Sequence, residues 1–379
     1  MSLVKRILLG AAAVLVLGIA TLAVLLSYES PCSEPDALAQ DAASMKAVVH
    51  RCYGSAEVLK VEHVPKPVPA EGELLVKVIA SSVNPADWHY MTGTPYVMRL
   101  SSGFGAPKGV QRGIDFAGVV EALGPNVSTF KVGEEVFGAH GGAFAEFISV
   151  SATDGIARKP QNLSFEQAAT LPVAAITALQ GLRDHGNVGT GTKVLINGAS
   201  GGVGTFAVQI AKALGAEVTG VCSTRNVEMV RSIGADHVID YTQRNFTEGA
   251  ERYDVILDNV GNHGLLKVRQ ALKPRGKLVI IGGPKQDPWL GPVSSPVKAA
   301  MLSPFIDEQM AMFIAQVNSK DLKVLAELAL NGKIVPVIDR RYALSDIAEA
   351  MRYLGTQRAR GKVVLQVDAA GAAQYLSGV

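Results

Sequence analysis

The stretch "NGASGGVGTFAVQIAKALGAEVTGVCSTR", residues 197–225, decides the fold class of this chain. It begins as a glycine-rich turn directly after an apolar run and continues, over 202–214, with the apolar spacing of an amphipathic helix. Glycines permit a tight turn and a close approach of the backbone to a ligand, and the N-terminus of the following helix attracts an anion. In the G-x-G-x-x-G frame the three positions are Ala199, Gly201 and Gly204. The stretch therefore predicts a strand, a phosphate-binding loop and a helix, as in a dinucleotide-binding fold.

Apolar strands alternate with helical segments through the middle of the chain. The expected strands are 193–198, 217–223, 237–241, 253–260 and 277–283, and the expected helices between them are 202–214, 226–233 and 263–272. Upstream, 164–186 has helical character, with Ser164 and Gln167 spaced as a capping box and Pro172 breaking or kinking the helix. The alternation predicts a doubly wound parallel sheet, an α/β Rossmann domain over 164–304.

The segment before residue 164 is different, because Gly and Pro interrupt it at short intervals. Its strand-like runs are 46–50, 74–80, 116–123, 135–138 and 144–150, and they predict a compact antiparallel barrel or sandwich. After residue 304 we expect helices at 307–317, 320–331 and 345–354 and strands within 335–344 and 361–367. We therefore expect one β-rich domain built from 45–163 and 305–367, to which the nucleotide domain is added.

Residues 1–44 are a separate leader. Lys5 and Arg6 precede twenty uncharged residues, Ile7–Leu26, a length that spans a hydrocarbon core of roughly 30 Å. We interpret this run as an uncleaved single-pass helix followed by a polar linker. The alternatives are a cleaved signal, with its cleavage region in 37–44, and a true start at Met45. The two cations favour a cytoplasmic N-terminus and an external domain.

Composition excludes several classes of protein. With 379 residues, 48% hydrophobic and 18% charged, the chain is long and apolar enough for two folded domains and is not disordered. The net charge of +2 gives no reason to expect nucleic acid as a partner. Cys32, Cys52 and Cys222 are too few and too scattered for a disulfide framework, so nothing in the sequence requires an oxidising compartment.

The end of the second Rossmann strand predicts the cofactor. An Asp or Glu there would accept the 2′-hydroxyl of NAD, but the chain has Cys-Ser-Thr-Arg at 222–225. The hydroxyl of Ser223 and the guanidinium of Arg225 are donors that suit the 2′-phosphate of NADP, with Tyr241 at the end of the next strand. Because NADPH is supplied in the cytosol, it favours a domain that faces the cytoplasm, whereas the charge rule favours the opposite side. The side of the membrane stays open at this point, with the cytoplasmic side slightly favoured.

Zinc chemistry is not expected. A catalytic zinc needs about three Cys, His or carboxylate ligands, and the seven histidines lie far apart without ligand spacing to the cysteines. Without a metal, the simplest reaction for NADPH is reduction of a quinone or an activated double bond. In that reaction the carbonyl of the substrate accepts the electrons, and the protein supplies positioning and a proton.

From Met45 to about Val367 the chain resembles the zinc-independent, quinone-oxidoreductase-like branch of the medium-chain dehydrogenase/reductase superfamily. Within that branch it is similar to the group that includes the reticulon-interacting mitochondrial NADPH oxidoreductase. The motifs that carry this resemblance are "SSVNPADW" (81–88), "GIDFAGVVEALGPNVSTFKVGEEVFG" (113–138), "GAFAEF" (142–147), "AATLPVAAITALQGL" (168–182), "VLINGASGGVGTFAVQIAK" (194–212), "GVCSTRNVEMVRSIGADHVIDY" (220–241), "LDNVG" (257–261) and "ARGKVV" (359–364).

The resemblance implies a GroES-like catalytic domain and a Rossmann domain with a cleft between them. Zinc-dependent relatives place a cysteine where this chain has Asn84, and the histidine of a Gly-His-Glu motif within what is here 113–115. Asn84 and Asp87 would line the nicotinamide and substrate pocket, and Tyr96 is the nearest match to a tyrosine that contacts substrate in some relatives. The implied cofactor-binding residues are Thr177, Ser200, Gly201, Gly202, Val203, Gly204, Ser223, Arg225, Tyr241, Asn259, Val260 and Lys362.

The function expected is therefore an NADPH-dependent reductase of quinones, enones or carbonyls, with NADP(H) as cofactor and no metal. Its partners would be a small-molecule electron acceptor and the lipid bilayer. The resemblance also allows a homodimer, for which the sequence indicates no interface. Two alternatives stay open at this point. One is a membrane-tethered NADPH sensor or scaffold without turnover, and the more distant one is a zinc-dependent alcohol dehydrogenase.

Overall fold

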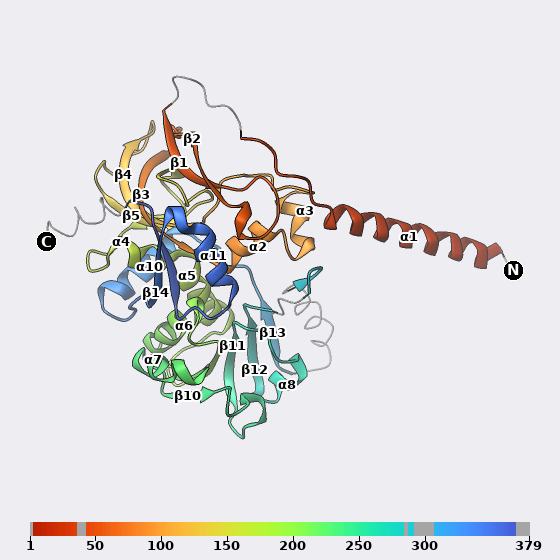
Figure 1. The fold of residues 1–379 in the computed structure, drawn as a ribbon. Coiled ribbons are helices and arrows are strands. Elements are labelled where there is room, and N and C mark those ends of the chain that lie inside the picture. The colour runs from red at the N-terminus through yellow and green to blue at the C-terminus, as the bar shows by residue number, and fades with distance from the viewer. Residues whose placement is uncertain (1–2, 36–42, 284–286, 292–306, 369–379) are drawn as a thin grey trace.

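Two sheets, packed together through helices, form the body of the protein, and a single long helix projects from it (Figure 1). The computed structural model describes residues 3–35, 43–283, 287–291 and 307–368. The leader, the N-terminal β-rich part and the C-terminal elements lie on one side, and the parallel sheet lies on the other.

The first sheet has seven strands in the order β14-β15-β3-β4-β5-β7, with β6 paired to β3. Its strands are β3 (Glu73–Val83), β4 (Asp115–Leu123), β5 (Glu135–Ala139), β6 (Phe147–Ser151), β7 (Ile156–Arg158), β14 (Ile338–Ala343) and β15 (Lys362–Gln366), and β1 (Ser44–Val49) pairs with β2 (Lys60–Pro65) in a separate hairpin. β15 lies antiparallel to β3. The C-terminal strands thus return to the N-terminal sheet, as the sequence predicts.

The second sheet is a six-stranded parallel sheet in the order β10-β9-β8-β11-β12-β13. Its strands are β8 (Lys193–Asn197), β9 (Glu217–Cys222), β10 (His237–Asp240), β11 (Tyr253–Asp258), β12 (Leu272–Ile280) and β13 (Gln309–Met312). The chain fills one half of the sheet from β8 outward and the other from β11 outward. The strand order therefore reverses between β8 and β11, which is where doubly wound folds form their ligand crevice.

Helices cover both sheets. Their bounds are α2 (Pro85–Thr92), α3 (Arg99–Ser102), α4 (Phe165–Ala168), α5 (Pro172–Gln180), α6 (Gly202–Ala213), α7 (Val227–Ser232), α8 (Leu265–Arg269), α10 (Ser319–Leu330) and α11 (Ile347–Gly355). The expected helix at 164–186 is divided as predicted: Ser164 and Gln167 form a capping box on α4, and Pro172 begins α5. One buried apolar cluster joins α5, α6 and the parallel sheet, and it includes Ala175, Phe206 and Leu257.

The expected helix at 307–317 is wrong, because Gln309–Met312 forms β13 at the edge of the parallel sheet. Two features favour a strand over a helix here. Met310 and Met312, two residues apart, both pack on the apolar cluster of the sheet, as the period-two spacing of a strand requires. The edge of β12 also offers backbone groups for hydrogen bonds. The division into domains stays a prediction, with the correction that the parallel sheet includes a strand beyond residue 304.

The leader folds as α1 (Leu3–Ser27), which leaves the body as one helix. Its segment Leu9–Ser27 has a mean hydropathy of 2.6 and is long enough to cross a membrane by length and composition. Beyond α1, Cys32 and Cys52 form a disulfide that joins the linker to the body. The sequence analysis expected no disulfide framework, and it did not predict this single bond between two residues that are 20 positions apart.

Candidate functional site

A buried charged network lies where the two sheets meet. Register brings its members together: β3 runs between β4 and β15, with Ser82 opposite Asp115 and Val83 opposite Val363. Asp115 therefore begins β4 beside the end of β3, and Lys362 begins β15 on the other side. Asn84, directly after β3, joins them. All of these polar side chains are at least 97% buried, and we refer to Ser82, Asn84, Asp87, Asp115 and Lys362 as the cleft network.

The Asp115 carboxylate is the centre of this network. Its Oδ2 accepts hydrogen bonds from Ser82 Oγ at 2.6 Å and Asn84 Nδ2 at 2.8 Å, and the Lys362 ammonium lies 3.4 Å away. Its Oδ1 accepts from the backbone N–H of Val173 at 2.9 Å, in the first turn of α5. Both oxygens of the Asp115 side chain are therefore hydrogen-bonded, one to the first turn of a helix and the other beside a buried lysine.

Lys362 connects the network to the glycine loop. Its ammonium donates to Asn84 Oδ1 at 2.5 Å and to the carbonyl of Val83 at 3.3 Å. Burial lowers the pKa of Lys362, while the nearby carboxylates of Asp115 and Asp87 act in the opposite direction. The aliphatic stem passes Gly202, where a Cβ would stand 3.1 Å from Lys362 Cδ. The resemblance implies that Lys362 binds the cofactor, and the structure places its stem at the loop and its ammonium beside Asn84 and Asp115.

Asp87 is the titratable acid of the site. It occupies the third position of α2, where its Oδ2 accepts the backbone N–H of Asn84 at 2.8 Å. Burial raises the pKa of Asp87 to about 7, the Asn84 amide lowers it, Asp115 raises it, and the cations Lys362 and Arg112 lower it. A carboxyl group that exchanges its proton near neutral pH is suited to general acid–base catalysis. The pKa of Asp87 is therefore compatible with the role in a substrate pocket that the resemblance implies.

The glycine loop makes a close turn between β8 and α6. Gly198 adopts φ +79°, and the Gly201 N–H donates to its carbonyl at 3.1 Å. A Cβ on Gly204 would stand 2.1 Å from that carbonyl, so the close turn into α6 requires glycine there. Ser200 and Gly361 are hydrogen-bonded through their backbones at 2.9 Å, which brings the segment before Lys362 alongside the loop.

Two orphaned acceptors flank this loop and provide a test of whether a dinucleotide fits. Asn226 donates to Ser200 Oγ at 3.0 Å, and Asn259 donates to the Asn197 carbonyl at 3.0 Å. The Oδ1 atoms of both amides are buried without a partner among the described residues. A buried acceptor is costly unless it is bonded, and the ribose hydroxyls of a dinucleotide are donors of the required kind. The residues present therefore fit a dinucleotide, and Asn226 extends the expected set.

The end of β9 carries the donors that the sequence analysis singled out, and one acid lies next to it. Ser223 and Arg225 follow β9, and Arg225 donates to the carbonyl of Arg358 at 2.5 Å, while Tyr241 is 58% exposed after β10. Asp240 pairs with Cys222 across the strands, so an acid does stand near the strand end. Its carboxylate is bound by the hydroxyls of Thr224 and Thr242, and these hydrogen bonds lower its pKa.

The remaining predicted residues lie in three places. Thr177 is on α5, where its hydroxyl bonds the Val173 carbonyl at 2.7 Å, and α5 packs against α6. Val260 packs against the glycine loop, since a Cβ on Gly198 would stand 2.7 Å from Cγ2 of Val260. Tyr96 is not brought into the cleft network by any described contact. Its ring lies against Trp289 at 5.1 Å between centroids and beneath Arg99 at 4.7 Å.

Sequence reasoning missed Asp115 and Arg112 as members of the site. Asp115 stands in the quoted motif "GIDFAG", where a charged residue at the start of an apolar strand is the signal that could have found it. Arg112 interacts with Asp87, and burial lowers the pKa of Arg112 to about 10. The partners of these two residues cannot be recognised from the linear sequence, because they lie far away along the chain, on α2 and β3.

The donor set does not fit a zinc ion. Over residues 3–35, 43–283, 287–291 and 307–368, no three His, Cys, Asp or Glu residues are grouped as metal ligands. The cleft network instead surrounds the ammonium of Lys362, which is the cation paired with Asp115. Zinc prefers thiolate, imidazole and carboxylate ligands. The network has the two carboxylates of Asp87 and Asp115 but no thiolate or imidazole, and its other groups are an amide, a hydroxyl and a lysine.

Comparison with known families matches both parts of the chain. Residues 70–161 match the alcohol dehydrogenase GroES-like domain, and residues 233–365 match the family described as zinc-binding dehydrogenase. The second description names zinc binding, and the donor set above departs from it.

Three similar proteins cover most of the chain. The chain is 32% identical over 336 residues to the chloroplastic NADPH-dependent alkenal/one oxidoreductase of Arabidopsis thaliana, covering 85% of this chain and 79% of that protein. It is 36% identical to the human mitochondrial NAD(P)H oxidoreductase RTN4IP1, covering 85% and 89%. The structure of the quinone oxidoreductase from Coxiella burnetii superposes with a TM-score of 0.76 at 30% identity, covering 86% of this chain and 100% of that one.

Proposed function

The chain belongs to the quinone-oxidoreductase-like branch of the medium-chain dehydrogenase/reductase superfamily, and from this premise we propose the residues and acceptor of its reaction. It is an NADPH-dependent oxidoreductase that transfers hydride to a quinone or enone acceptor. The observation that carries the assignment of the site is the cleft network, which places a proton-exchanging acid and a buried ammonium beside the glycine loop.

In our proposal, three groups of residues hold the cofactor. Ser200–Gly204 bind the pyrophosphate through backbone amides and the N-terminus of α6, helped by the stem of Lys362 at Gly202. Asn259 and Val260 border the nicotinamide ribose, and Thr177 approaches from α5. Ser223, Arg225 and Tyr241 hold the 2′-phosphate. NADPH supplies the hydride when it is bound.

The residues of the network would manage the proton and the developing negative charge. Reduction of an enone adds a hydride to the β-carbon and a proton to the α-carbon, and the carbonyl oxygen carries the negative charge between the two events. Asp87 exchanges a proton near neutral pH, and Lys362 holds an ammonium beside Asp115. We propose Asp87 as the proton donor through the pocket, with Asn84 orienting both Asp87 and Lys362 through its backbone and its amide.

We also propose that α1 anchors the enzyme in a membrane as a single-pass helix. Its apolar length supports this role. We retain the domain on the cytoplasmic side, because the reaction consumes NADPH. The two N-terminal cations and the Cys32–Cys52 disulfide favour the opposite side, since disulfides persist in oxidising compartments. Labelling of Cys32 and Cys52 in sealed vesicles, with an impermeant maleimide after reduction, decides the side.

An acceptor screen with NADPH and NADH side by side tests the proposed function. The full chain in detergent or vesicles should oxidise NADPH when a quinone or enone is added, and NADH much more slowly. Arg225→Ala should raise the KM for NADPH by about tenfold, because a charge-assisted hydrogen bond to phosphate is lost, and leave the KM for NADH unchanged. Arg231→Ala, an exposed arginine paired with Glu228 on α7, is the matched control.

Two results would overturn the proposal. NADPH binding without any acceptor-dependent oxidation would indicate a sensor or scaffold. A preference for NADH would contradict the roles of Ser223 and Arg225.

A further inference from the structure

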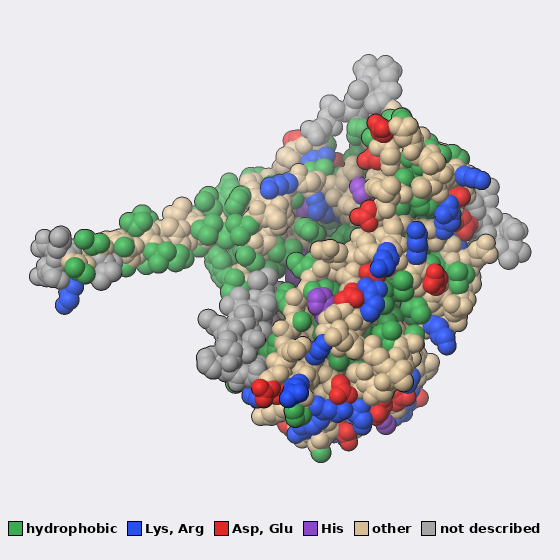
Figure 2. Space-filling model, turned by 180° about the vertical axis from the view of Figure 1, so that it is seen from behind, with side chains coloured by type: hydrophobic (Ala, Val, Ile, Leu, Met, Phe, Trp, Pro, Cys, Tyr) green, Lys and Arg blue, Asp and Glu red, His purple; other side chains and the backbone are tan. Residues whose placement is uncertain are grey.

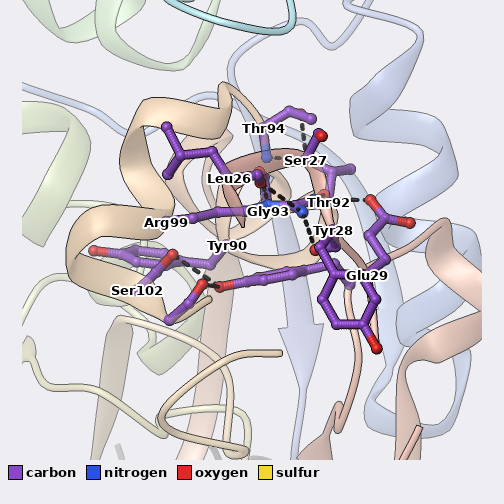
Figure 3. A network of polar contacts seen from close by, with 12 residues as sticks. Leu26, Ser27, Tyr28, Glu29, Tyr90, Thr92, Gly93, Thr94, Arg99 and Ser102 are labelled. Carbon is purple, nitrogen blue, oxygen red and sulfur yellow. Dashed lines mark hydrogen bonds and ion pairs between the residues drawn. The ribbon is translucent and has the colours of Figure 1, made fainter. Parts of the chain in front are cut away.

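The end of α1 is clamped to the catalytic domain by one buried arginine (Figure 3). Arg99, which is 0% exposed, donates from Nη1 to the carbonyls of Leu26 and Tyr28 at 3.0 and 2.9 Å. Its Nη2 binds the Glu29 carboxylate at 2.8 Å. On the side of the body, its Nε donates to the Gly93 carbonyl at 2.7 Å. The guanidinium therefore joins the last turn of the apolar helix to the segment after α2.

This contact satisfies groups that a helix end leaves open. The last carbonyls of a helix have no partner within the helix, and the negative end of its dipole attracts a cation. Arg99 supplies both the hydrogen bonds and the charge, and its planar group lies over the Tyr53 and Tyr96 rings at 4.4 and 4.7 Å. The clamp would lose several hydrogen bonds at once if α1 moved.

Two further links follow along the linker. The Ser30 N–H donates to the Gly105 carbonyl at 2.9 Å, in a parallel bridge between Glu29 and Gly105. The Cys32–Cys52 disulfide comes next. Successive attachments at 26–29, 30 and 32 fix the direction of α1 relative to the body, which a flexible tether would not do.

A largely apolar surface surrounds the clamp; the Glu29 carboxylate follows Tyr28 there, and the Asp287 carboxylate accepts the backbone N–H of Trp289. Tyr28, Leu100, Phe104, Trp289 and Leu290 are 42–58% exposed, and we refer to these five residues as the shelf. Backbone hydrogen bonds at 2.7 and 3.2 Å hold 288–289 against 96–97, so both loops belong to one surface. Arg99, which is buried, is the single charged residue in the sequence from 94 to 107. Figure 2 shows hydrophobic side chains gathered where α1 meets the body.

We propose that the shelf rests in the interfacial layer of the bilayer that α1 spans, so that the catalytic domain is held in one orientation on the membrane. This inference rests on the proposed anchoring role of α1 and goes beyond it, because an anchor alone requires no second contact. The shelf is continuous with the end of the apolar segment Leu9–Ser27. Three of its five members are Tyr, Phe and Trp, aromatic residues that suit the boundary between hydrocarbon and water.

The orientation has a consequence for the acceptor. α2 carries Asn84 at its N-cap and Thr92 at its other end, next to the residues that hold Arg99. A helix of 8 residues is about 12 Å long, so Asn84 of the cleft network and the segment that holds Arg99 are separated by about that distance along α2. A lipid-dissolved quinone would then enter the site from the membrane surface without crossing water.

The two tryptophans of the chain allow a direct test. Trp289 belongs to the shelf, whereas Trp88 packs on α11, where a Cβ on Gly355 would stand 2.6 Å from its ring. The full chain is reconstituted in phosphatidylcholine vesicles with brominated acyl chains. Trp88→Phe, which keeps Trp289, should lose most of its fluorescence to the bromines, and Trp289→Phe, which keeps Trp88, should lose little.

Each alternative gives a different result. Vesicle-bound protein in which neither tryptophan is quenched would overturn the shelf contact and leave α1 as a simple tether. If Trp289 is shielded and cross-linking shows pairs of chains, a second copy covers the shelf and the proposal is wrong. If the chain does not sediment with vesicles, the anchoring role itself fails.

An acceptor comparison separates this inference from the proposed function. Phe104→Asp should raise the KM for a lipid-dissolved quinone several-fold and leave the rate with a water-soluble quinone unchanged. Val132→Asp, at an apolar side chain that is 63% exposed between β4 and β5, is the control and should change neither. An equal effect of Phe104→Asp on both acceptors would overturn the inference. Absence of activity with either acceptor in the unmodified chain would instead contradict the proposed function.

Discussion

Lys362 and Arg99 are both buried cations, and their surroundings differ in kind. Lys362 faces a carboxylate and an amide beside the glycine loop, and burial lowers its pKa. Arg99 faces mainly backbone carbonyls and two aromatic rings at the end of α1. A lysine can release its proton in such a site, whereas a guanidinium keeps its proton in any protein environment. The comparison indicates that Lys362 has a role in the reaction, whereas Arg99 has a structural role.

The largest expected effect is on Lys362. Lys362→Met keeps the length of the stem and removes the charge beside Asp115. Acceptor-dependent NADPH oxidation should fall by about 100-fold, the typical cost of removing one stabilising group from an active site. The fold should survive, because Asp115 keeps Ser82, Asn84 and the Val173 amide.

Lys159→Met is the matched control, since Lys159 is 5% exposed and pairs with Glu135 at 2.9 Å outside the cleft. It should lower thermal stability with little change in kcat. Equal losses of activity in the two variants would mean that Lys362 is merely structural.

The next effect concerns the clamp. Arg99→Ala leaves the carbonyls of Leu26, Tyr28 and Gly93 without their donor, and we expect a loss of about 2 kcal/mol in the free energy of unfolding. Arg99→Lys should recover little of it, since one ammonium cannot replace the planar fork. Limited proteolysis of the linker after Ser27 should become faster in both variants. An unchanged proteolysis rate and melting temperature would show that α1 needs no clamp.

The last prediction concerns the pH dependence that Asp87 causes. Its pKa of about 7 lies above the ordinary value of 3.8, so the native state binds a proton that the unfolded state has lost between these two values. Stability therefore falls as pH rises through this window, and a rate that needs the protonated acid falls above pH 7. Asp87→Asn should lower kcat and flatten that alkaline limb, and it should lose less stability than the parent between pH 5 and 8. Measurements of kcat and of melting temperature between pH 5 and 8 test this prediction. If the alkaline limb of the kcat profile persists in Asp87→Asn, another group is responsible for the titration.

Most of the fold could be predicted from the sequence because its signals are local. Each signal lies within a short stretch of residues: the glycine loop, the alternation of strands and helices, and the capping box at Ser164. The strand at Gln309–Met312 was not predicted, because its four residues form a strand only by pairing with β12. The alternation of Met310 and Met312 is too short to indicate a strand without that pairing.

The site could be predicted only in part, for a related reason. The sequence indicates Asn84, Asp87 and the loop through motifs, but the Asp115–Lys362 pair joins residues 247 positions apart. The Arg99 clamp and the Cys32–Cys52 bond likewise depend on how the leader returns to the body. Long-range pairs of this kind follow from sheet register and helix packing, which one sequence does not contain.

Deuteride transfer by the metal-depleted enzyme tests the central claim most directly. The full chain is treated with a chelator and given NADPH deuterated at the transferable position of the nicotinamide, together with an enone. The account predicts that deuterium appears at the β-carbon of the reduced product and that the rate equals that of the untreated enzyme. Loss of activity on chelation with recovery on adding zinc, or a product without deuterium, would contradict a metal-free hydride transfer in this cleft.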